Sequence, residues 1–386
     1  MNETNNIEKI LKKLLIIILF AITFGTTPLQ FSCFKTEESV SKVTSETNRW
    51  LELLRVIPEN EDTIKAAYLS DLTLEAAISI EIGYNISNHI PIWGTSPLKY
   101  NDKEWKETLG FTKDEVSYTI YAGSLPMDYY QAVLGEFSWE DIDNAARTGP
   151  GNDDVMIYTY AGHDFYSWGE DRDMRMSKRS NIRPLGRGHR LAISGNFLFW
   201  VMWTDGIQDM IDAYERNIPS FADNENYQLL ADKLQEFGTV NAFFSSESHS
   251  LAHYYELTPR GNLEKNSDSS MVKTLIEGLD YEYPLISYLA LATGVGKDEN
   301  GYYMVIILLN NSANIAKENS KILKKRINTI NLVVPEDISW KDIIDKIEVG
   351  YDGRFTTAKL YGNAVDWWNQ FEIAGAMSYQ PLLVSE

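Results

Sequence analysis

The sequence is poor in cysteine and in positive charge. Cys33 is the only cysteine, so no disulfide can form within the chain. Lysine and arginine total 35, against 55 aspartates and glutamates, which gives a formal net charge of −20 over 386 residues. Because binding to nucleic-acid phosphates requires surplus cations, we expect no nucleic-acid partner. Without a disulfide framework, the fold must be held by its own packing.

Apolar residues are not scarce, and this excludes a disordered chain. They make up 44% of the sequence, far above the level typical of intrinsic disorder. A chain of this length is expected to form one large domain or two ordinary ones. Either arrangement has enough core to fold unaided.

The longest apolar run lies near the N-terminus and is short. Lys9, Lys12 and Lys13 precede the apolar residues Leu14–Phe24, and helix-breaking residues, including Pro28, follow. Spanning a bilayer takes about 20 apolar residues, which this run does not reach. A positive region, a short apolar core and a polar end are the layout of a secretory signal. We therefore predict a signal peptide over residues 1–32 and an extracytoplasmic location for the rest.

The cysteine comes directly after this segment. Its placement in Leu29–Cys33 (LQFSC) resembles the lipobox of bacterial lipoproteins, in which a small residue, here Ser32, precedes the lipidated cysteine. Several acyl chains on such a thiol would anchor a protein stably. We predict a lipid on Cys33 that attaches the protein to the bacterial membrane, with residues 33–47 as a polar tether. An uncleaved signal-anchor and an ordinary cleaved signal are the alternatives.

The body alternates between strand and helix patterns. Hairpins are predicted over residues 155–168, 191–203, 285–309 and 347–361, and helices over 207–216, 224–237, 312–328 and 340–347. The motif Ser-Trp-x-Asp-Ile occurs at Ser138 and again at Ser339, each at a predicted helix start where serine is a natural N-cap, and its recurrence hints at duplication. We predict an α+β fold: antiparallel sheets with helices packed on one face. Residues 48–250 and 251–386 form either two related units or one continuous domain.

An arginine-rich segment stands out in so acidic a chain. Residues 172–190 hold seven lysines and arginines. Arginine binds phosphate and carboxylate in a bidentate manner, and the amides of Gly186 and Gly188 could approach an anion closely. The alternative is that the segment pairs with acids of the protein itself, beginning with Glu170, Asp171 and Asp173. The candidate anion-binding residues are Arg179, Arg183, Arg187, His189 and Arg190.

Catalytic motifs are weak or absent. His249 and His253 share a helical spacing but lack the glutamate of a zinc protease, and Ser270 with Lys273 lacks the other elements of a penicillin-binding enzyme. No G-x-S-x-G, Walker A or G-x-G-x-x-G sequence is present. We therefore predict no catalytic residue, no metal and no cofactor.

Several stretches resemble uncharacterised bacterial secreted proteins and lipoproteins. They are Arg49–Leu54 (RWLELL) with Ile57-Pro58, Tyr166–Asp171 (YSWGED) and Leu185–Gly188 (LGRG). The resemblance implies no catalytic residue, since such families have no assigned activity. The sequence favours a membrane-tethered extracytoplasmic lipoprotein with a non-enzymatic binding or accessory role toward a small molecule, glycan or protein. The alternatives are an exported hydrolase whose acids meet only in three dimensions, and a structural or assembly component of the cell envelope.

Overall fold

A single antiparallel sheet organises the described part of the chain. The computed structural model describes residues 48–60, 63, 66–82, 102–124, 128–149, 154–179, 186–246, 284–329, 340–362, 381–383 and 385. The chain divides into two units, Met1–Ser45 and Glu46–Glu386, and every described residue belongs to the second. The predicted signal peptide, Cys33 and the tether therefore lie outside the described residues. So do His249, His253, Ser270 and Lys273.

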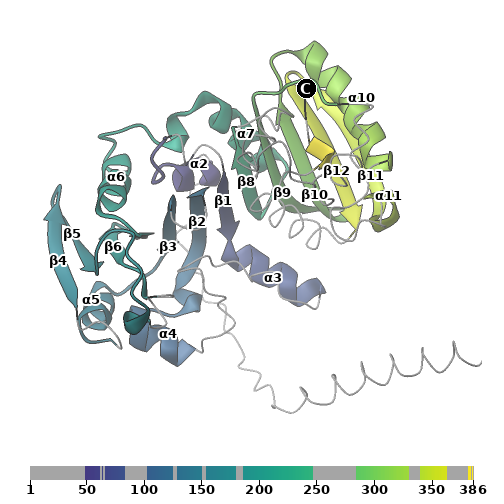
Figure 1. Ribbon diagram of the computed structural model, residues 1–386. Coiled ribbons are helices and arrows are strands. Elements are labelled where there is room, and N and C mark those ends of the chain that lie inside the picture. Colours follow the sequence, from purple (N-terminus) through teal and green to yellow (C-terminus); the bar gives the residue numbers. More distant parts are fainter. Residues whose placement is uncertain are drawn as a thin grey trace, which may run out of the picture. The chain divides into compact units, whose positions relative to one another are not determined.

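Among the described residues the sheet contains twelve strands, in the order β11-β12-β10-β9-β8-β1-β2-β3-β7-β6-β5-β4 (Figure 1). All pairs of neighbouring strands are antiparallel, which confirms the predicted α+β class. The strands are β1 (Ala67–Asp71), β2 (Val116–Ser124), β3 (Asp128–Gly135), β4 (Val155–Tyr160), β5 (His163–Trp168), β6 (His189–Ser194), β7 (Phe197–Val201), β8 (Asn241–Ser245), β9 (Ala290–Asp298), β10 (Gly301–Leu309), β11 (Ile344–Asp352) and β12 (Phe355–Gly362).

Strands from both predicted halves join in this one sheet. β8 lies before residue 250, β9 lies after it, and the two pair through Phe243–Ser245 and Leu291–Thr293. The predicted boundary at residue 250 itself lies outside the described residues. Among those residues, no helix is both long and apolar enough to cross a membrane.

Helices lie on both faces of the sheet, whereas we expected them on one. The reason is visible in β10, whose residues are apolar without alternation. Val305, Ile307 and Leu309 join the core beneath α2, α6 and α7, while Met304 and Ile306 join a second core with α10 and α11. A strand that is apolar on both sides must be covered on both sides. The helices are α2 (Arg49–Leu54), α3 (Leu72–Ile82), α4 (Asp102–Leu109), α5 (Trp139–Thr148), α6 (Thr204–Tyr214), α7 (Glu225–Glu236), α10 (Ala313–Thr329) and α11 (Trp340–Ile343).

Local polar residues start several of these helices. The Asn48 side chain accepts hydrogen bonds from Trp50 N and Leu51 N at the start of α2, and Ser138 accepts from Asp141 N at the start of α5. These contacts satisfy amide groups that have no partner within the helix. The Ser138 cap is the one that the Ser-Trp-x-Asp-Ile motif predicts.

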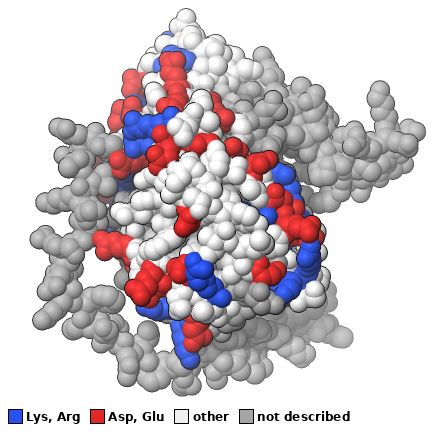
Figure 2. All heavy atoms as spheres, turned by 90° about the vertical axis from the view of Figure 1, so that its left-hand side faces the viewer, with Lys and Arg blue, Asp and Glu red and all other residues white. Residues whose placement is uncertain are grey.

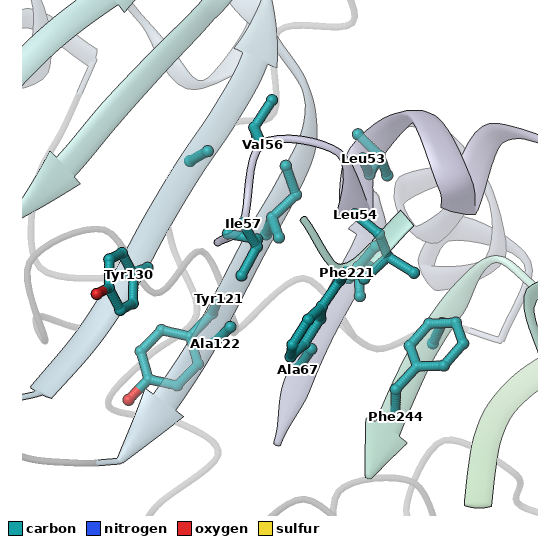
Figure 3. Packing of buried hydrophobic residues seen from close by; sticks show 14 of the residues in the cluster. Leu53, Leu54, Val56, Ile57, Ala67, Tyr121, Ala122, Tyr130, Phe221 and Phe244 are labelled. Carbon is teal, nitrogen blue, oxygen red and sulfur yellow. The ribbon is translucent and has the colours of Figure 1, made fainter. Parts of the chain in front are cut away.

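The largest core lies between the sheet and α2, α6 and α7. Figure 3 shows Leu54, Ile57 and Phe221 gathered over strands β1 and β2. All three side chains are 0% exposed. Phe221 also stacks on Tyr227 of α7, with ring centroids 4.6 Å apart, so this core ties α2 to α7 as well as to the sheet.

One predicted helix is shorter in the structure. We expected a helix over residues 340–347, but α11 ends at Ile343 and β11 begins at Ile344. Residues 344–352 pair along β12 instead, with a register shift between Ile344 and Lys346. Ladder pairing to a neighbouring strand outweighs the local helical spacing here, because it buries Ile347 and Val349 partly against the second core.

The hairpin between β4 and β5 turns on a strained residue, and this leads to a stability prediction. Ala161 has a φ of 49° and Gly162 a φ of 85°, the pattern of a type I′ turn. Asparagine tolerates the left-handed region better than alanine does. Ala161→Asn is therefore expected to raise the free energy of unfolding by about 0.5–1 kcal/mol. Urea unfolding of the full-length protein in a non-ionic detergent measures the change.

A β-branched residue at the same position is the matched control. Ala161→Val places a stiff side chain in the left-handed region and is expected to lower the free energy of unfolding. If the valine variant proves as stable as the asparagine variant, the turn conformation does not limit the stability of this hairpin.

Candidate functional site

A cavity of about 650 Å³ opens beside the last strands of the sheet, at the N-terminus of α6. Its lining includes Met156 and Tyr158 of β4, Arg190 of β6, and Thr204 and Gln208 of α6. The loop after β5 contributes Glu170, Asp171 and Arg175 to the same lining. The volume falls within the range of about 300–1,000 Å³ that is common for ligand sites.

Arg190 is the most enclosed charge in this cavity. Its side chain is 4% exposed, and its Nη2 lies 2.5 Å from Oδ1 of Asp171. The same guanidinium donates to Thr204 Oγ1 at 3.1 Å and to the carbonyl oxygens of Trp168 and His189 at 3.3 and 3.2 Å. Each of these contacts uses N–H donors of the planar guanidinium group, so the donors of Arg190 serve groups of the protein itself and not a bound anion.

Asp171 joins two elements that are distant in sequence. Besides Arg190, its carboxylate accepts hydrogen bonds from Thr204 N and Thr204 Oγ1, each at 2.8 Å. Thr204 is the first residue of α6, where amide groups lack partners within the helix and the helix dipole favours negative charge. Asp171 therefore caps α6 from outside the helix while it neutralises Arg190.

Arg175 is also paired within the loop. It contacts Glu170 Oε1 at 3.0 Å and forms an ion pair with Asp173. The hydrogen bond and charge of Asp173, followed by those of Glu170, raise the pKa of Arg175. Arg175 and Arg190 are therefore paired with acids of the protein itself, as the alternative to an anion site predicts.

Gly186 and Gly188 allow the backbone of the segment to lie close to the preceding loop, and not to a bound anion. A Cβ on Gly186 would lie 1.6 Å from the carbonyl oxygen of Arg175, and a Cβ on Gly188 would lie 2.1 Å from that of Glu170. The Arg175 amide donates to Gly186 O at 3.1 Å, and the Gly188 amide donates to Asp173 O at 3.0 Å. The Gly188 amide is therefore engaged by the preceding loop and is not available to an anion.

The remaining candidate residues of the segment do not gather in one place. His189 and Arg190 are neighbours on β6 and point to opposite faces, as successive residues of a strand must. His189 is fully buried, with its ring 4.5 Å from that of Trp200. Arg187 donates a hydrogen bond to Tyr129, while burial raises the pKa of that tyrosine. Arg179 caps a short 3₁₀ turn, and Arg183 lies outside the described residues.

A hydrogen-bond network that the sequence did not reveal joins β5, β6 and the end of α6. Ser194 Oγ is 2.9 Å from His163 Nδ1, and His163 Nε2 is 2.9 Å from Glu215 Oε1. Serine, histidine and acid in this order suit nucleophilic catalysis, but Ser194 is only 1% exposed. The network therefore links these elements structurally. No sequence signal could have found it, since the three residues share no motif.

Asp209 of α6 has a perturbed pKa but does not line the cavity. Burial raises the pKa of Asp209, and Tyr130 donates a hydrogen bond to it at 3.3 Å. Among the described residues, no group of three or more histidine, cysteine, aspartate or glutamate side chains is placed to hold a metal ion.

Comparisons with known proteins give structural similarity only. No family model matches the chain, and no curated protein matches it. Crystal forms I, III and IV of TP0453 are similar at TM-scores of 0.38, 0.35 and 0.38, with sequence identities of 10%, 11% and 10%. They cover 84%, 80% and 85% of this chain, and the matches span 97%, 91% and 100% of TP0453.

Proposed function

We propose that this chain is an extracytoplasmic binding protein that a lipid on Cys33 holds at a bacterial membrane. The location is supported by the N-terminal sequence, in which a lysine-rich start, the short apolar run Leu14–Phe24 and Cys33 follow one another. The role is supported by the cavity between β4, β6 and α6, which is open to a ligand of moderate size.

The state of the charges in the cavity favours binding over catalysis. A hydrolytic site needs titratable groups that are free to exchange protons with a substrate. In this cavity Asp171 is engaged by Arg190 and by the start of α6, and Glu170 is engaged by Arg175. This pairing is the observation that carries the proposal, because it leaves a preorganised polar wall rather than a reactive group.

The lipid anchor is tested by metabolic labelling with a palmitate analogue in bacteria that produce the full-length protein. The wild-type protein is expected to carry the label and to sediment with membranes, and Cys33→Ala is expected to lose the label completely, because alanine has no thiol to acylate. Ser32→Ala is the matched control, and it should keep the label because alanine is also small.

Three results would contradict this anchor. A label that persists in Cys33→Ala places the lipid elsewhere. An unlabelled wild-type protein that still sediments with membranes indicates an uncleaved signal-anchor. Unprocessed full-length protein free in the cytosol would contradict export altogether.

A further inference from the structure

The two edges of the sheet differ in how they are protected against pairing with another strand. β11 forms one edge with the sequence IDKIEVGYD, which carries Asp345, Lys346, Glu348 and Asp352 as well as a register shift at its start. Charged side chains and bulges of this kind discourage the addition of a further strand. The edge at β11 is therefore protected.

The other edge, β4, lacks these features. Its sequence, VMIYTY, contains no charged residue, no proline and no glycine. Within the described residues β4 pairs with β5 alone, so one side of its backbone is unpaired there. Apolar and β-branched segments with an open edge are templates for strand addition.

The side chains of β4 are also unusually open to solvent. Met156 is 57% exposed and Tyr158 is 46% exposed, and both lie on the same face of the strand. Figure 2 views the side of the molecule that carries β4 and β5 and shows a broad, largely uncharged area with an acidic side chain within it and acidic and basic side chains around it. Exposed apolar side chains such as Met156 and Tyr158 in such surroundings are typical of a surface that binds a partner.

The cavity lies on the same face as these exposed side chains. Met156 pairs with Ser167, and Ser167 pairs with Arg190, so the register places all three on one face, where they line the cavity. A strand added to β4 would direct alternate side chains toward this face. Main-chain hydrogen bonds would then supply affinity, and the cavity would select the side chains that fit.

The charges of the cavity favour a basic partner over an acidic one. The guanidinium groups of Arg175 and Arg190 are held by carboxylates of the chain itself. An incoming carboxylate would compete with Glu170 and Asp171 for them, whereas an incoming ammonium group meets carboxylates that stay open to solvent, since the Glu170 side chain is 81% exposed and that of Asp171 is 45% exposed. The net charge of −20 attracts basic segments and repels a second copy of this chain.

We propose that the open edge of β4 binds an extended segment of a partner polypeptide, with alternating apolar and basic side chains, as a thirteenth strand of the sheet. This partner class rests on the binding role proposed above. The basic side chains of the segment point to the cavity face, toward Glu170, and its apolar side chains point to the opposite face, where Val155 and Ile157 of β4 are partly buried.

Fluorescence anisotropy of the full-length protein in a non-ionic detergent tests this proposal. The probe is a short fluorescent peptide in which lysine alternates with valine and isoleucine. Wild-type protein is expected to bind it, and added salt to weaken binding. A peptide with glutamate in place of lysine should not bind. A lysine peptide methylated at alternate backbone nitrogens should not bind either, because it cannot complete the ladder.

Variants at the two edges form a matched pair. Tyr158→Lys puts a charge on the open edge and is expected to weaken binding about tenfold or more. Tyr351→Lys makes the same change on β11, where the tyrosine is 49% exposed, and should leave binding unchanged. Met156→Lys serves as a second variant at β4 if Tyr158→Lys does not fold.

Several results would overturn the proposal. Equal binding by the methylated peptide would mean that no strand is added, and equal binding by both β4 variants would place the peptide elsewhere. A failure of wild-type protein to bind the lysine peptide would remove the partner class. A wild-type dimer that Tyr158→Lys dissociates would assign the edge to a second copy instead. All of these results are independent of labelling at Cys33, so the failure of one proposal is distinguishable from the failure of the other.

Discussion

Asp171→Ala is expected to lower the free energy of unfolding by about 3 kcal/mol, because it leaves the buried Arg190 cation without its carboxylate. The Arg190 side chain is 4% exposed, so water reaches it poorly when the acid is removed. The substitution also removes the acceptor for Thr204 N at the start of α6. Loss of a helix cap alone costs about 1 kcal/mol. Urea unfolding of the full-length protein in detergent measures the change.

A neighbouring acid provides the control for Asp171→Ala. Asp173 lies in the same loop and pairs with Arg175, but the Arg175 side chain is 47% exposed. An exposed pair contributes at most about 1 kcal/mol, so Asp173→Ala is expected to have a small effect. Equal losses in the two variants would show that burial of the cation does not decide the stability of this loop.

Gly186→Ala is expected to lower the free energy of unfolding by about 3 kcal/mol, which the same urea titration measures. Two costs combine at this position. Its φ of +67° is unfavourable for any residue with a Cβ, and a Cβ there would lie 1.6 Å from the carbonyl oxygen of Arg175. Relief requires residues near Arg175 and Gly186 to move apart, which breaks the hydrogen bond from Arg175 N to Gly186 O.

Gly353→Ala separates these two costs. Gly353 has a similar φ of +52°, but a Cβ added there would meet no other atom within 4 Å. Only the conformational cost, about 1–2 kcal/mol, is expected there. The difference between the two variants measures the close approach of the backbones. If Gly186→Ala costs no more than Gly353→Ala, the loop accommodates the added methyl group without strain.

The hairpins of this protein are readable from its sequence because their signals are local. Alternating apolar runs separated by Ala161-Gly162 and by Gly195-Asn196 predict the pairs β4–β5 and β6–β7, and the structure confirms both. Ser138 is likewise a local signal, since a helix cap contacts a backbone amide three residues away. Such features need no knowledge of distant parts of the chain.

The arginine-rich segment shows where this reasoning stops. Its composition suggests an anion site, but a one-residue step along β6 sends His189 and Arg190 to opposite faces of the sheet. Asp171 is one of several acids whose position in the chain allows pairing with the segment. Nothing in the order of residues shows that it reaches Arg190 and the start of α6 together.

The hydrogen-bond network of Ser194, His163 and Glu215 could not be predicted from the sequence for a similar reason. It joins two strands and the end of α6, and its members become neighbours only when these elements pack. The contrast between the edges is also a property of the packed sheet. The uncharged sequence of β4 is visible in the chain, but its position at an edge follows from the order of the twelve strands in the described part of the chain.

Short-range patterns in the chain were thus sufficient for the α+β class, the antiparallel hairpins and the helix caps, because turn and capping energies depend on residues close in sequence. The two-sided core, the Asp171–Arg190 pair, the cavity and the open edge at β4 arise from contacts between residues far apart in sequence. Folding brings these residues together by burying apolar surface. The free energy of that burial depends on the area buried and has no direction, so the order of residues does not show which distant segments will meet.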